Sequence, residues 1–392
     1  MKTNALSVSI VFILWLAGLG AAAQFAKIAV PFAAIRATFP NSGDEIGWLL
    51  SLISLLGAVF GLIVGDVVGR LGAKRVLVFG LGVGAVISLG QAGGLSFTML
   101  VVSRLFEGAS HMAIVVAAPT LISTLCPSRY TGVAMTLWST FFGVAFAVVA
   151  WIVVPVVGAD RFELVFAGHG VYMAMLTLVI LFLIPRDQLN ETATPRRKLE
   201  VFSVHARAYA SPRIAAPGLG WLLYTFTFVS LLALLPERLP EAQTPLATGL
   251  MPIVSIITAL FAVPLLLQRM SSVTVILLGF ALAAVCVVAN TLLNMPLIYA
   301  VGLFAILGLV QGASFCAVPE LNSNSTDEAL AYGLMAQTGN IGNLLGTPVL
   351  IALSSRVGHL GMDMFVVGIY LAGVGVHLVL ARERRKAQHT AV

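Results

Sequence analysis

Apolar runs long enough to cross a bilayer recur along the whole chain. A spanning helix needs roughly 20 apolar residues, because each residue adds only about 1.5 Å to the length of a helix. The sequence contains twelve such runs between turn signals. Their approximate cores are residues 8–35, 46–68, 75–93, 97–124, 131–157, 163–184, 214–235, 247–267, 273–292, 296–321, 329–353 and 363–381. The pattern predicts an all-α integral membrane protein with 12 transmembrane helices.

Composition supports this class and excludes several others. Hydrophobic residues make up 59% of the chain and charged residues only 10%, whereas a soluble protein has roughly 25% charged residues. The net charge of +6 comes from short loops and the tail, so membrane topology explains it better than nucleic-acid binding. The three cysteines, Cys126, Cys286 and Cys316, form no CxxC pair. We therefore expect the lipid bilayer as a partner, and no nucleic acid, metal or cofactor.

The distribution of lysine and arginine predicts the orientation in the membrane. If both termini are cytoplasmic, 16 of the 22 basic residues fall in cytoplasmic loops or the tail. The outer loops hold only Arg161, Arg238 and Arg356. An excess of Lys and Arg is typical of cytoplasmic loops. We expect a multi-pass protein of a bacterial inner (cytoplasmic) membrane, with both termini in the cytoplasm.

A polar, basic stretch divides the predicted spans six and six. We expect an N-terminal six-helix bundle at 1–185, a cytoplasmic linker at 186–213, a C-terminal six-helix bundle at 214–381 and a cytoplasmic tail at 382–392. Within the linker, the sequence predicts a short amphipathic helix around 199–209 that lies on the membrane surface.

The two halves are faintly similar in sequence. Glu-Gly-Ala-Ser at 107–110 is echoed by Gln-Gly-Ala-Ser at 311–314, an offset of 204. Further along, the pentapeptide PTLIS at 119–123 is echoed by PELNS at 319–323, an offset of 200. Two related bundles with a site between them form a common plan of transporters. We expect such a pseudo-symmetric pair of bundles in a monomer.

The span at 97–124 carries Arg104, Glu107 and His111. At about 100° per residue, these three lie within roughly 60° of one another on a helix. The first two are three residues apart and the last two are four apart, so each pair can touch. Lys27 lies in the outer half of the first span, far from its end. Charges inside a bilayer are costly unless paired or wetted, so we expect this helix to face a polar cavity.

These four residues are candidates for substrate binding and proton coupling. We expect Lys27 and Arg104 to contact the substrate, since a guanidinium suits bidentate carboxylate recognition. We expect Glu107 and His111 to carry protons, since histidine titrates near physiological pH and a carboxylate against an apolar wall can bind a proton. The alternatives are structural. Lys27 can snorkel along its helix, Arg104 can form a fixed ion pair, and Glu107 and His111 can form a static hydrogen-bonded pair.

Other polar residues within the spans are weaker candidates. Tyr224 lies in the seventh span, and Gln337 and Asn340 begin a polar stripe on one face of the eleventh. The stripe fits cavity lining and helix–helix hydrogen bonding equally well. We count Tyr224, Gln337 and Asn340 among the substrate-binding candidates. His169, in the sixth span, is interpreted as structural.

The loop after the second span resembles a known family motif. Residues 65–75 read GDVVGRLGAKR, which is similar to the loop motif GxxxDRxGRK of the major facilitator superfamily. Gly65, Arg70, Gly72 and Lys74 match the motif. Gly69 stands where the family has an Asp, and Asp66 can partly take the place of that missing carboxylate. Residues 104–110, RLFEGAS, resemble the family's fourth-helix motif RxxxGxG. The general pattern is also somewhat similar to cyanate-permease-type carriers.

The resemblance implies a rocker-switch carrier built from two pseudo-symmetric six-helix bundles. In this family, helices one, four, seven and ten line a central cavity, while helices three, six, nine and twelve lie outside, facing lipid. The resemblance also implies a loop motif that controls the conformation of the carrier, with the residues Gly65, Asp66, Arg70, Gly72 and Lys74.

Together these observations predict a secondary active transporter, not an enzyme. Lys27 and Arg104 against Glu107 give the predicted cavity a net charge of +1. This charge favours a small anionic or zwitterionic organic solute, imported together with protons. The alternative is a proton-driven exporter of drugs or metabolites, although the fifth span lacks the Gly-Pro motif of many drug exporters. A membrane enzyme or sensor is disfavoured, because the sequence has no nucleophile or metal constellation.

Overall fold

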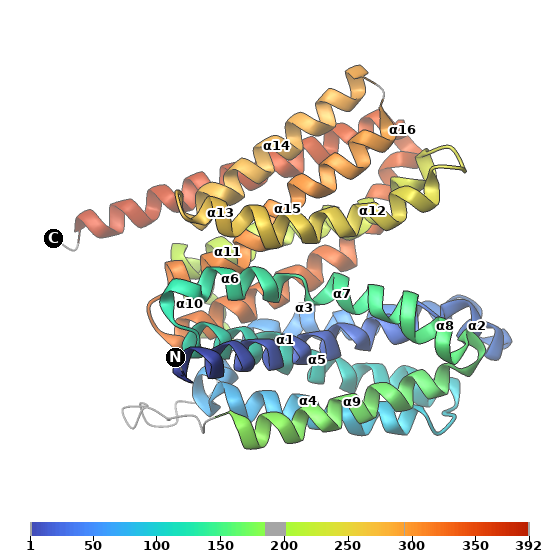
Figure 1. Cartoon of the computed structure of the whole chain (residues 1–392). Coiled ribbons are helices and arrows are strands. Elements are labelled where there is room, and N and C mark those ends of the chain that lie inside the picture. Colours follow the sequence, from blue (N-terminus) through green and yellow to red (C-terminus); the bar gives the residue numbers. More distant parts are fainter. Residues whose placement is uncertain (1, 185–200, 294, 391–392) are drawn as a thin grey trace. The chain divides into compact units, whose positions relative to one another are not determined.

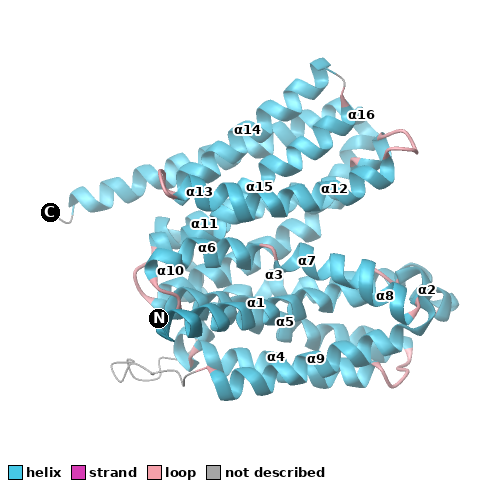
Figure 2. Ribbon diagram, viewed as in Figure 1, coloured by secondary structure: helices cyan, strands magenta, loops and turns pink. Residues whose placement is uncertain are grey.

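The structure is a computed structural model that describes residues 2–184, 201–293 and 295–390. These residues are almost entirely helical, and none of them forms a strand (Figure 2). The predicted all-α class is therefore confirmed.

The elements follow one another along the chain as helices joined by short turns (Figure 1). In order they are α1 (Lys2–Ala29), α2 (Phe32–Thr38), η1 (Pro40–Gly47), α3 (Trp48–Leu71), α4 (Ala73–Gln91), α5 (Phe97–Leu125), α6 (Ser128–Ser139), α7 (Phe141–Val148), η2 (Val149–Val153), α8 (Val154–Val157), η3 (Ala159–Arg161), α9 (Phe162–Leu183), α10 (Val201–Ala210), α11 (Pro212–Leu234), η4 (Pro236–Arg238), α12 (Thr244–Ile257), η5 (Thr258–Ala262), α13 (Val263–Leu267), α14 (Ser272–Leu293), α15 (Pro296–Leu321) and α16 (Ser325–Thr390).

Ten helices in the described part of the chain are long and apolar enough to cross a membrane. The bent pair Ser128–Ser139 and Phe141–Val157 raises this number to 11 if it forms one span. The last candidate, in α16, joins two helices across a non-helical backbone conformation at Gly358. The helices are therefore compatible with the twelve predicted spans.

Clustering of backbone contacts separates the chain into two compact units, each described here by itself. Unit 1 consists of Met1–Ser128, Phe141–Val204 and Ser325–Ala336. Unit 2 consists of Arg129–Thr140, His205–Asn324 and Gln337–Val392. Each unit is built mainly from one half of the sequence and exchanges one short segment. The predicted division at 186–213 remains a prediction.

Proline explains two irregular turns within the spanning helices. The π-helical turns η2 and η5 each precede a short helix with proline at its second position, namely Pro155 and Pro264. A proline lacks the N–H that would bond to the carbonyl four residues earlier, and a π-turn accommodates the local disruption of the ladder. Side-chain caps begin α5 and α11, where Ser96 accepts from the backbone N–H of Met99 and Ser211 accepts from that of Ile214.

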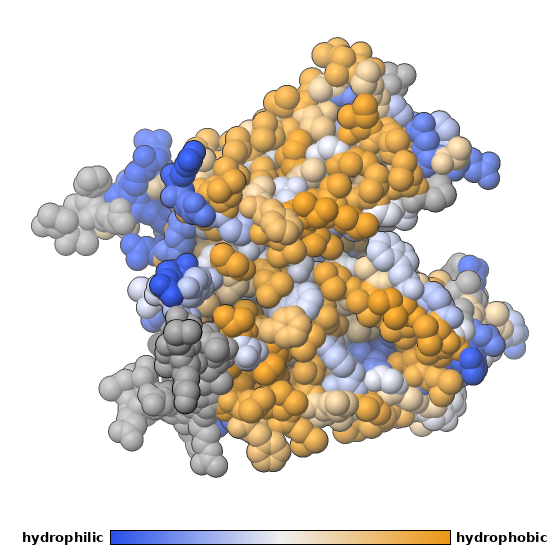
Figure 3. Space-filling view, viewed as in Figure 1, coloured by the Kyte–Doolittle hydropathy of each residue, from blue (hydrophilic) through white to orange (hydrophobic). Residues whose placement is uncertain are grey.

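The helix surfaces of each unit are largely apolar. Hydrophobic residues cover the visible sides of the helices, and hydrophilic residues gather near the helix ends (Figure 3). Large side chains such as Phe79, Val86 and Phe182 are mostly exposed. In water such a surface would be unfavourable, but it is the surface that a bilayer requires.

The linker is described only in part. The helix predicted around 199–209 is present as α10, Val201–Ala210, while residues 185–200 lie outside the described residues.

Candidate functional site

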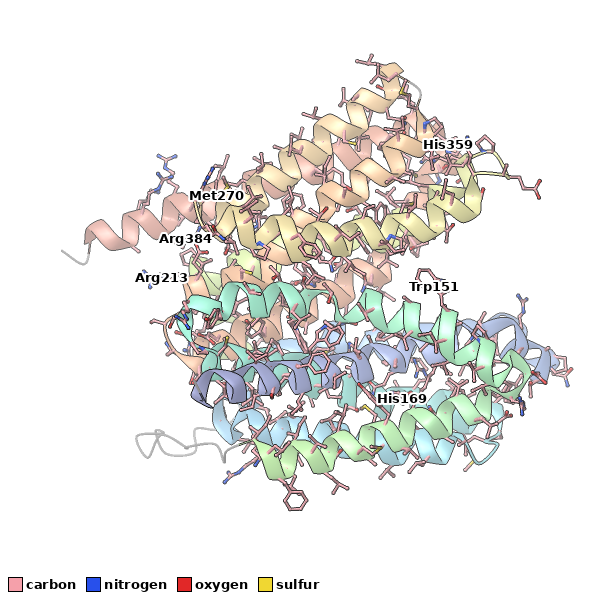
Figure 4. All side chains as sticks on the ribbon, viewed as in Figure 1. Trp151, His169, Arg213, Met270, His359 and Arg384 are labelled. Carbon is pink, nitrogen blue, oxygen red and sulfur yellow. The ribbon has the colours of Figure 1, made fainter. Side chains whose placement is uncertain are left out.

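Unit 1 contains a fully buried cluster of charged and polar side chains. Its members come from α1, α4, α5 and α9, and we call them the charged cluster: Gln24, Lys27, Ser88, Gln91, Arg104, Glu107, Ser110 and His169. Each of these side chains is less than 9% exposed. His169 projects from α9 (Figure 4), which also carries exposed apolar side chains such as Phe182.

Glu107 is the centre of the charged cluster. Its carboxylate forms ion pairs with both Lys27 and Arg104, and the three side chains are completely buried. The amide nitrogen of Gln91 donates to Glu107 Oε2 over 3.1 Å. The contact between Arg104 and Glu107, three residues apart on one helix, confirms the pairing that their spacing predicts.

Lys27 is held by three acceptors. Besides Glu107, its ammonium group donates to Ser88 Oγ at 2.5 Å and to Gln91 Oε1 at 2.6 Å. It also lies 5.4 Å from the centre of the Phe166 ring. Because all three hydrogens of an ammonium are used, Lys27 does not snorkel to the interface.

Arg104 ties three helices together. Its Nε donates to the Leu49 carbonyl at 2.8 Å, and its Nη1 donates to the Gln24 carbonyl at 2.9 Å and to Glu107. Its Nη2 is buried and has no hydrogen-bond partner among the described residues. The guanidinium is therefore anchored on one side and retains donors on the other.

The charges of the cluster do not balance. Lys27 and Arg104 contribute two positive charges and Glu107 one negative charge, which leaves a net +1 in a fully buried site. An unopposed charge in a low-dielectric interior is strongly unfavourable. The cluster is therefore poised to accept an anion or to lose a proton.

The two histidines near the cluster are fixed by backbone carbonyls. His169 Nε2 lies 2.9 Å from the Gly20 carbonyl, and its Nδ1 lies 2.8 Å from Ser88 Oγ. His111 Nδ1 lies 3.0 Å from the Ala21 carbonyl, and the ring packs edge-on against Phe25. Among the described residues, His111 makes no hydrogen bond to Glu107, so the static pair considered from the sequence is not formed.

A glycine makes room for the charged cluster. A Cβ added at Gly84 of α4 would lie 2.6 Å from Ser110 Oγ and 2.9 Å from Gln24 Nε2. Those two groups are hydrogen-bonded to each other at 2.8 Å, and Ser110 also donates to the Gly80 carbonyl at 2.6 Å. Close approach of α4 to α5 therefore depends on the absence of a side chain at this position.

The other substrate-binding candidates lie in unit 2. Tyr224 donates to Gln311 Oε1 at 2.9 Å, and Ser255 donates to the same oxygen at 3.0 Å. Gln311 Nε2 donates to the Ser139 carbonyl at 2.7 Å. We call these four residues the neutral cluster, because it contains no charged side chain.

Gln337 and Asn340 are buried residues of α16. Gln337 Nε2 lies 3.4 Å from His205 Nε2. The same helix packs closely on α11, since a Cβ at Gly342 would lie 2.7 Å from the Leu222 carbonyl oxygen. The glycine face of this helix therefore serves packing, and the roles of Gln337 and Asn340 in binding remain predictions.

The loop motif occupies the junction of α3 and α4. Arg70 Nε pairs with Asp66 Oδ2 at 2.6 Å, and Gly72 has a φ of 91°, which favours glycine. Lys74 donates to the carbonyls of Leu181 and Ile184 at 2.9 and 2.5 Å and thereby caps the end of α9. The fifth member, Gly65, approaches the backbone of α16 so closely that a Cβ would lie 2.6 Å from the Ala329 carbonyl oxygen.

Several members of the charged cluster were not predicted from the sequence. Ser88 and Gln91 lie on the third predicted span and His169 on the sixth, which the family pattern placed outside toward lipid. Ser88 and Gln91 are three residues apart and so share one helix face, which was an available signal. In the part of the chain that the structure describes, no group of three His, Cys, Asp or Glu could hold a metal ion.

Comparison with known proteins identifies the class of this chain. A family model described as Major Facilitator Superfamily matches residues 10–347. The chain therefore belongs to the major facilitator superfamily of transporters, as the loop and fourth-helix motifs implied. The resemblance to cyanate-permease-type carriers is not confirmed, and no curated protein sequence matches the chain.

Solved structures of two transporters share the fold. The human organic anion transporter MFSD10 (TETRAN) is 16% identical, covers 95% of this chain and 99% of its own, and has a TM-score of 0.78. The E. coli fucose:proton symporter FucP is 16% identical, covers 96% of this chain and 98% of its own, and has a TM-score of 0.75. FucP in the outward conformation gives a TM-score of 0.74 at 15% identity, over 95% and 98% of the two chains.

Proposed function

We propose that this transporter moves a small anionic or zwitterionic organic solute into the cell together with protons. One observation carries the proposal: two fully buried cations, Lys27 and Arg104, share the single carboxylate of Glu107. The excess positive charge is compensated when a carboxylate binds beside Arg104. The expected setting is a monomer in a bacterial inner membrane with both termini in the cytoplasm.

Arg104 is the residue that recognises the anion in this proposal. Its Nε and Nη1 are held by the carbonyls of Leu49 and Gln24, which fixes the plane of the guanidinium. Its Nη2 is buried without a hydrogen-bond partner among the described residues. When alternating access opens the cluster, Nη2 donates to an entering carboxylate without first breaking a bond within the protein.

The name of one fold neighbour supports the choice of an anion, and the name of the other supports proton coupling, since fucose itself is uncharged. One is an organic anion transporter and the other a fucose:proton symporter. The identities of 16% mean that these names support the choice of candidate ligands and nothing finer.

A ligand screen tests the proposal. The purified wild-type protein is heated with small carboxylates, inorganic anions, amines and lipophilic drugs. A ligand at about 100 times its dissociation constant stabilises the folded state by about 2.7 kcal/mol. We expect a carboxylate to raise the melting midpoint by roughly 5 °C, and we expect Arg104→Met to lose this shift. The positive carboxylate is then tested for uptake into proteoliposomes with and without an imposed pH gradient.

Ser314→Ala is the matched control for this screen. Among the described residues, the Ser314 hydroxyl bonds to the Val310 carbonyl of its own helix, so its removal should leave the ligand response intact. A carboxylate shift that is equal in Arg104→Met and wild type would refute the role of Arg104. Stabilisation by lipophilic cations alone would favour the drug-exporter alternative.

A further inference from the structure

The charge imbalance of the charged cluster also identifies which group can release a proton. Protonating Glu107 would leave Lys27 and Arg104 as two unopposed buried cations. Deprotonating Lys27 would instead leave a neutral pair of Arg104 and Glu107. Arginine itself does not lose its proton in proteins. We propose that Lys27 is the proton-carrying residue of this transporter and that Glu107 stays ionised throughout, contrary to the role that the sequence suggested.

Among the described residues, the titratable side chains that face Lys27 leave this imbalance in place. From α5 it is faced by Glu107 and Arg104, and from α9 by His169. From α4 it contacts the neutral side chains Ser88 and Gln91. The tightly packed helix α7, FFGVAFAV, has no titratable side chain.

The remaining neighbours of α1 are also accounted for. Helix α3 reaches the cluster through the carbonyl of Leu49. Its titratable residues Asp66 and Arg70 pair with each other near the opposite end of that helix. Helix α2 carries only Arg36, which is exposed, and the segment η2, VAWIV, carries no titratable side chain.

The contacts of His169 fit its neutral form. Its Nε2 faces the Gly20 carbonyl, which can only accept a hydrogen bond, so Nε2 carries a hydrogen. Its Nδ1 can then accept the hydroxyl hydrogen of Ser88, 2.8 Å away. This leaves the Ser88 oxygen free to accept from the Lys27 ammonium at 2.5 Å.

The same hydroxyl can stabilise Lys27 after it loses its proton. A neutral amine has two N–H donors and one lone pair, so one of its three present acceptors must become a donor. Glu107 has no hydrogen to donate, and the amide nitrogen of Gln91 already donates to Ser103 and Glu107. Of these three acceptors, the Ser88 hydroxyl can turn its hydrogen from His169 to the Lys27 lone pair. The released proton passes to water when the cluster opens.

This inference rests on the proposed proton coupling, but its test measures ionisation and needs no substrate. Melting midpoints are compared for the purified full-length protein in lipid nanodiscs, as wild type, Lys27→Met and Glu107→Gln. Lys27→Met keeps the balanced ion pair of Arg104 and Glu107, whereas Glu107→Gln removes the carboxylate that both cations of the charged cluster share. We expect the midpoint of Glu107→Gln to be lower than that of Lys27→Met by roughly 5 °C or more.

A double variant separates charge from simple structural damage. In Glu107→Gln, a protonated Lys27 lies beside Arg104 without a counter-charge, so acidification should lower the melting midpoint. Lys27→Met/Glu107→Gln has no group left to gain that proton, and its midpoint should not fall in this way. A Glu107→Gln midpoint equal to or above that of Lys27→Met would overturn the proposal, because glutamine mimics a protonated Glu107.

Infrared spectroscopy decides the question if Glu107→Gln fails to fold. Difference spectra between mildly acidic and mildly alkaline solution report carboxyl groups that gain a proton. We expect wild type and the double variant to show the same carboxylic acid bands. A band present in wild type and lost in the double variant would assign the proton to Glu107 and refute Lys27. If the ionisation tests give the expected results but uptake does not depend on a pH gradient, the proposed proton coupling is refuted and the assignment of the proton to Lys27 stands.

Discussion

The charged cluster of unit 1 and the neutral cluster of unit 2 are built around the same position of a repeated tetrapeptide. Glu107 begins Glu-Gly-Ala-Ser on α5, and Gln311 begins Gln-Gly-Ala-Ser on α15. Both side chains are buried and have nearly the same shape. Glu107 is surrounded by cations, while Gln311 accepts from two hydroxyls and donates to a carbonyl.

The difference between the two clusters lies in the partner helices. Helix α1 supplies the cation Lys27 to Glu107, whereas α11 and α12 supply the neutral hydroxyls of Tyr224 and Ser255 to Gln311. One repeated helix can therefore hold either a charge or a neutral amide, and its neighbours decide which. The proposed binding of anions and protons therefore belongs to the charged cluster.

The largest effect should follow from placing a charge in the neutral cluster. Gln311→Glu would set a carboxylate oxygen where Gln311 Nε2 now donates to the Ser139 carbonyl at 2.7 Å, with no cation in the cluster. We expect a loss of at least ~3 kcal/mol in stability at neutral pH. Stability should recover as the pH falls, because a protonated carboxyl can again donate to that carbonyl.

Melting midpoints over a range of pH test this prediction. Gln311→Met is the control, since it removes the same hydrogen bonds without adding a charge and should show no such recovery. A Gln311→Glu variant as stable as wild type at neutral pH would show that unit 2 tolerates a buried charge. The contrast between the two clusters would then be false.

A smaller effect should follow from changing the shape of a cation while keeping its charge. Arg104 reaches Leu49 with Nε and both Gln24 and Glu107 with Nη1, and a lysine ammonium cannot reproduce that fork. We expect Arg104→Lys to lose about 2 kcal/mol of stability. Arg238→Lys in unit 2 is the control, because Arg238 is partly buried and pairs with one carboxylate, Asp363. Equal losses in the two variants would contradict the special role of the fork.

The smallest effect separates the two serines of the repeat. Ser110 donates to the Gly80 carbonyl at 2.6 Å and accepts from Gln24 at 2.8 Å, so it links three helices. In the described part of the chain, Ser314 donates to the Val310 carbonyl, within its own helix. We expect Ser110→Ala to lose about 1 kcal/mol and Ser314→Ala less than ~0.5 kcal/mol. Chemical denaturation of the two variants measures the difference, and the reverse order would refute the structural contrast.

Much of the charged cluster could be predicted from local spacing. Arg104 and Glu107 are three residues apart on one helix, and they pair as the sequence predicts. His111 is four residues from Glu107, yet it bonds to the Ala21 carbonyl. Spacing along one helix predicts which of its side chains can meet. It cannot predict a hydrogen bond to a backbone carbonyl on a neighbouring helix.

The outer helices show the limit of a family pattern. The third and sixth predicted spans were assigned to the lipid-facing side, and their surfaces are indeed partly exposed and apolar, as at Phe79 and Phe182. Their opposite faces supply Ser88 and His169 to the charged cluster. A helix that faces lipid on one side can still contribute polar groups on the other, because its two faces are independent.

The sequence by itself determined the helical membrane class, the transporter family and the presence of buried charges. Apolar runs and basic loops are local properties, and lipid leaves the backbone few folds to adopt. The tertiary structure decided how those charges are compensated. Lys27 meets Ser88, Gln91 and Glu107 across 61 to 80 residues of chain. Such pairings depend on how the helices pack, because packing brings residues that are distant in the sequence into contact. The cluster of two cations and one anion follows from these contacts.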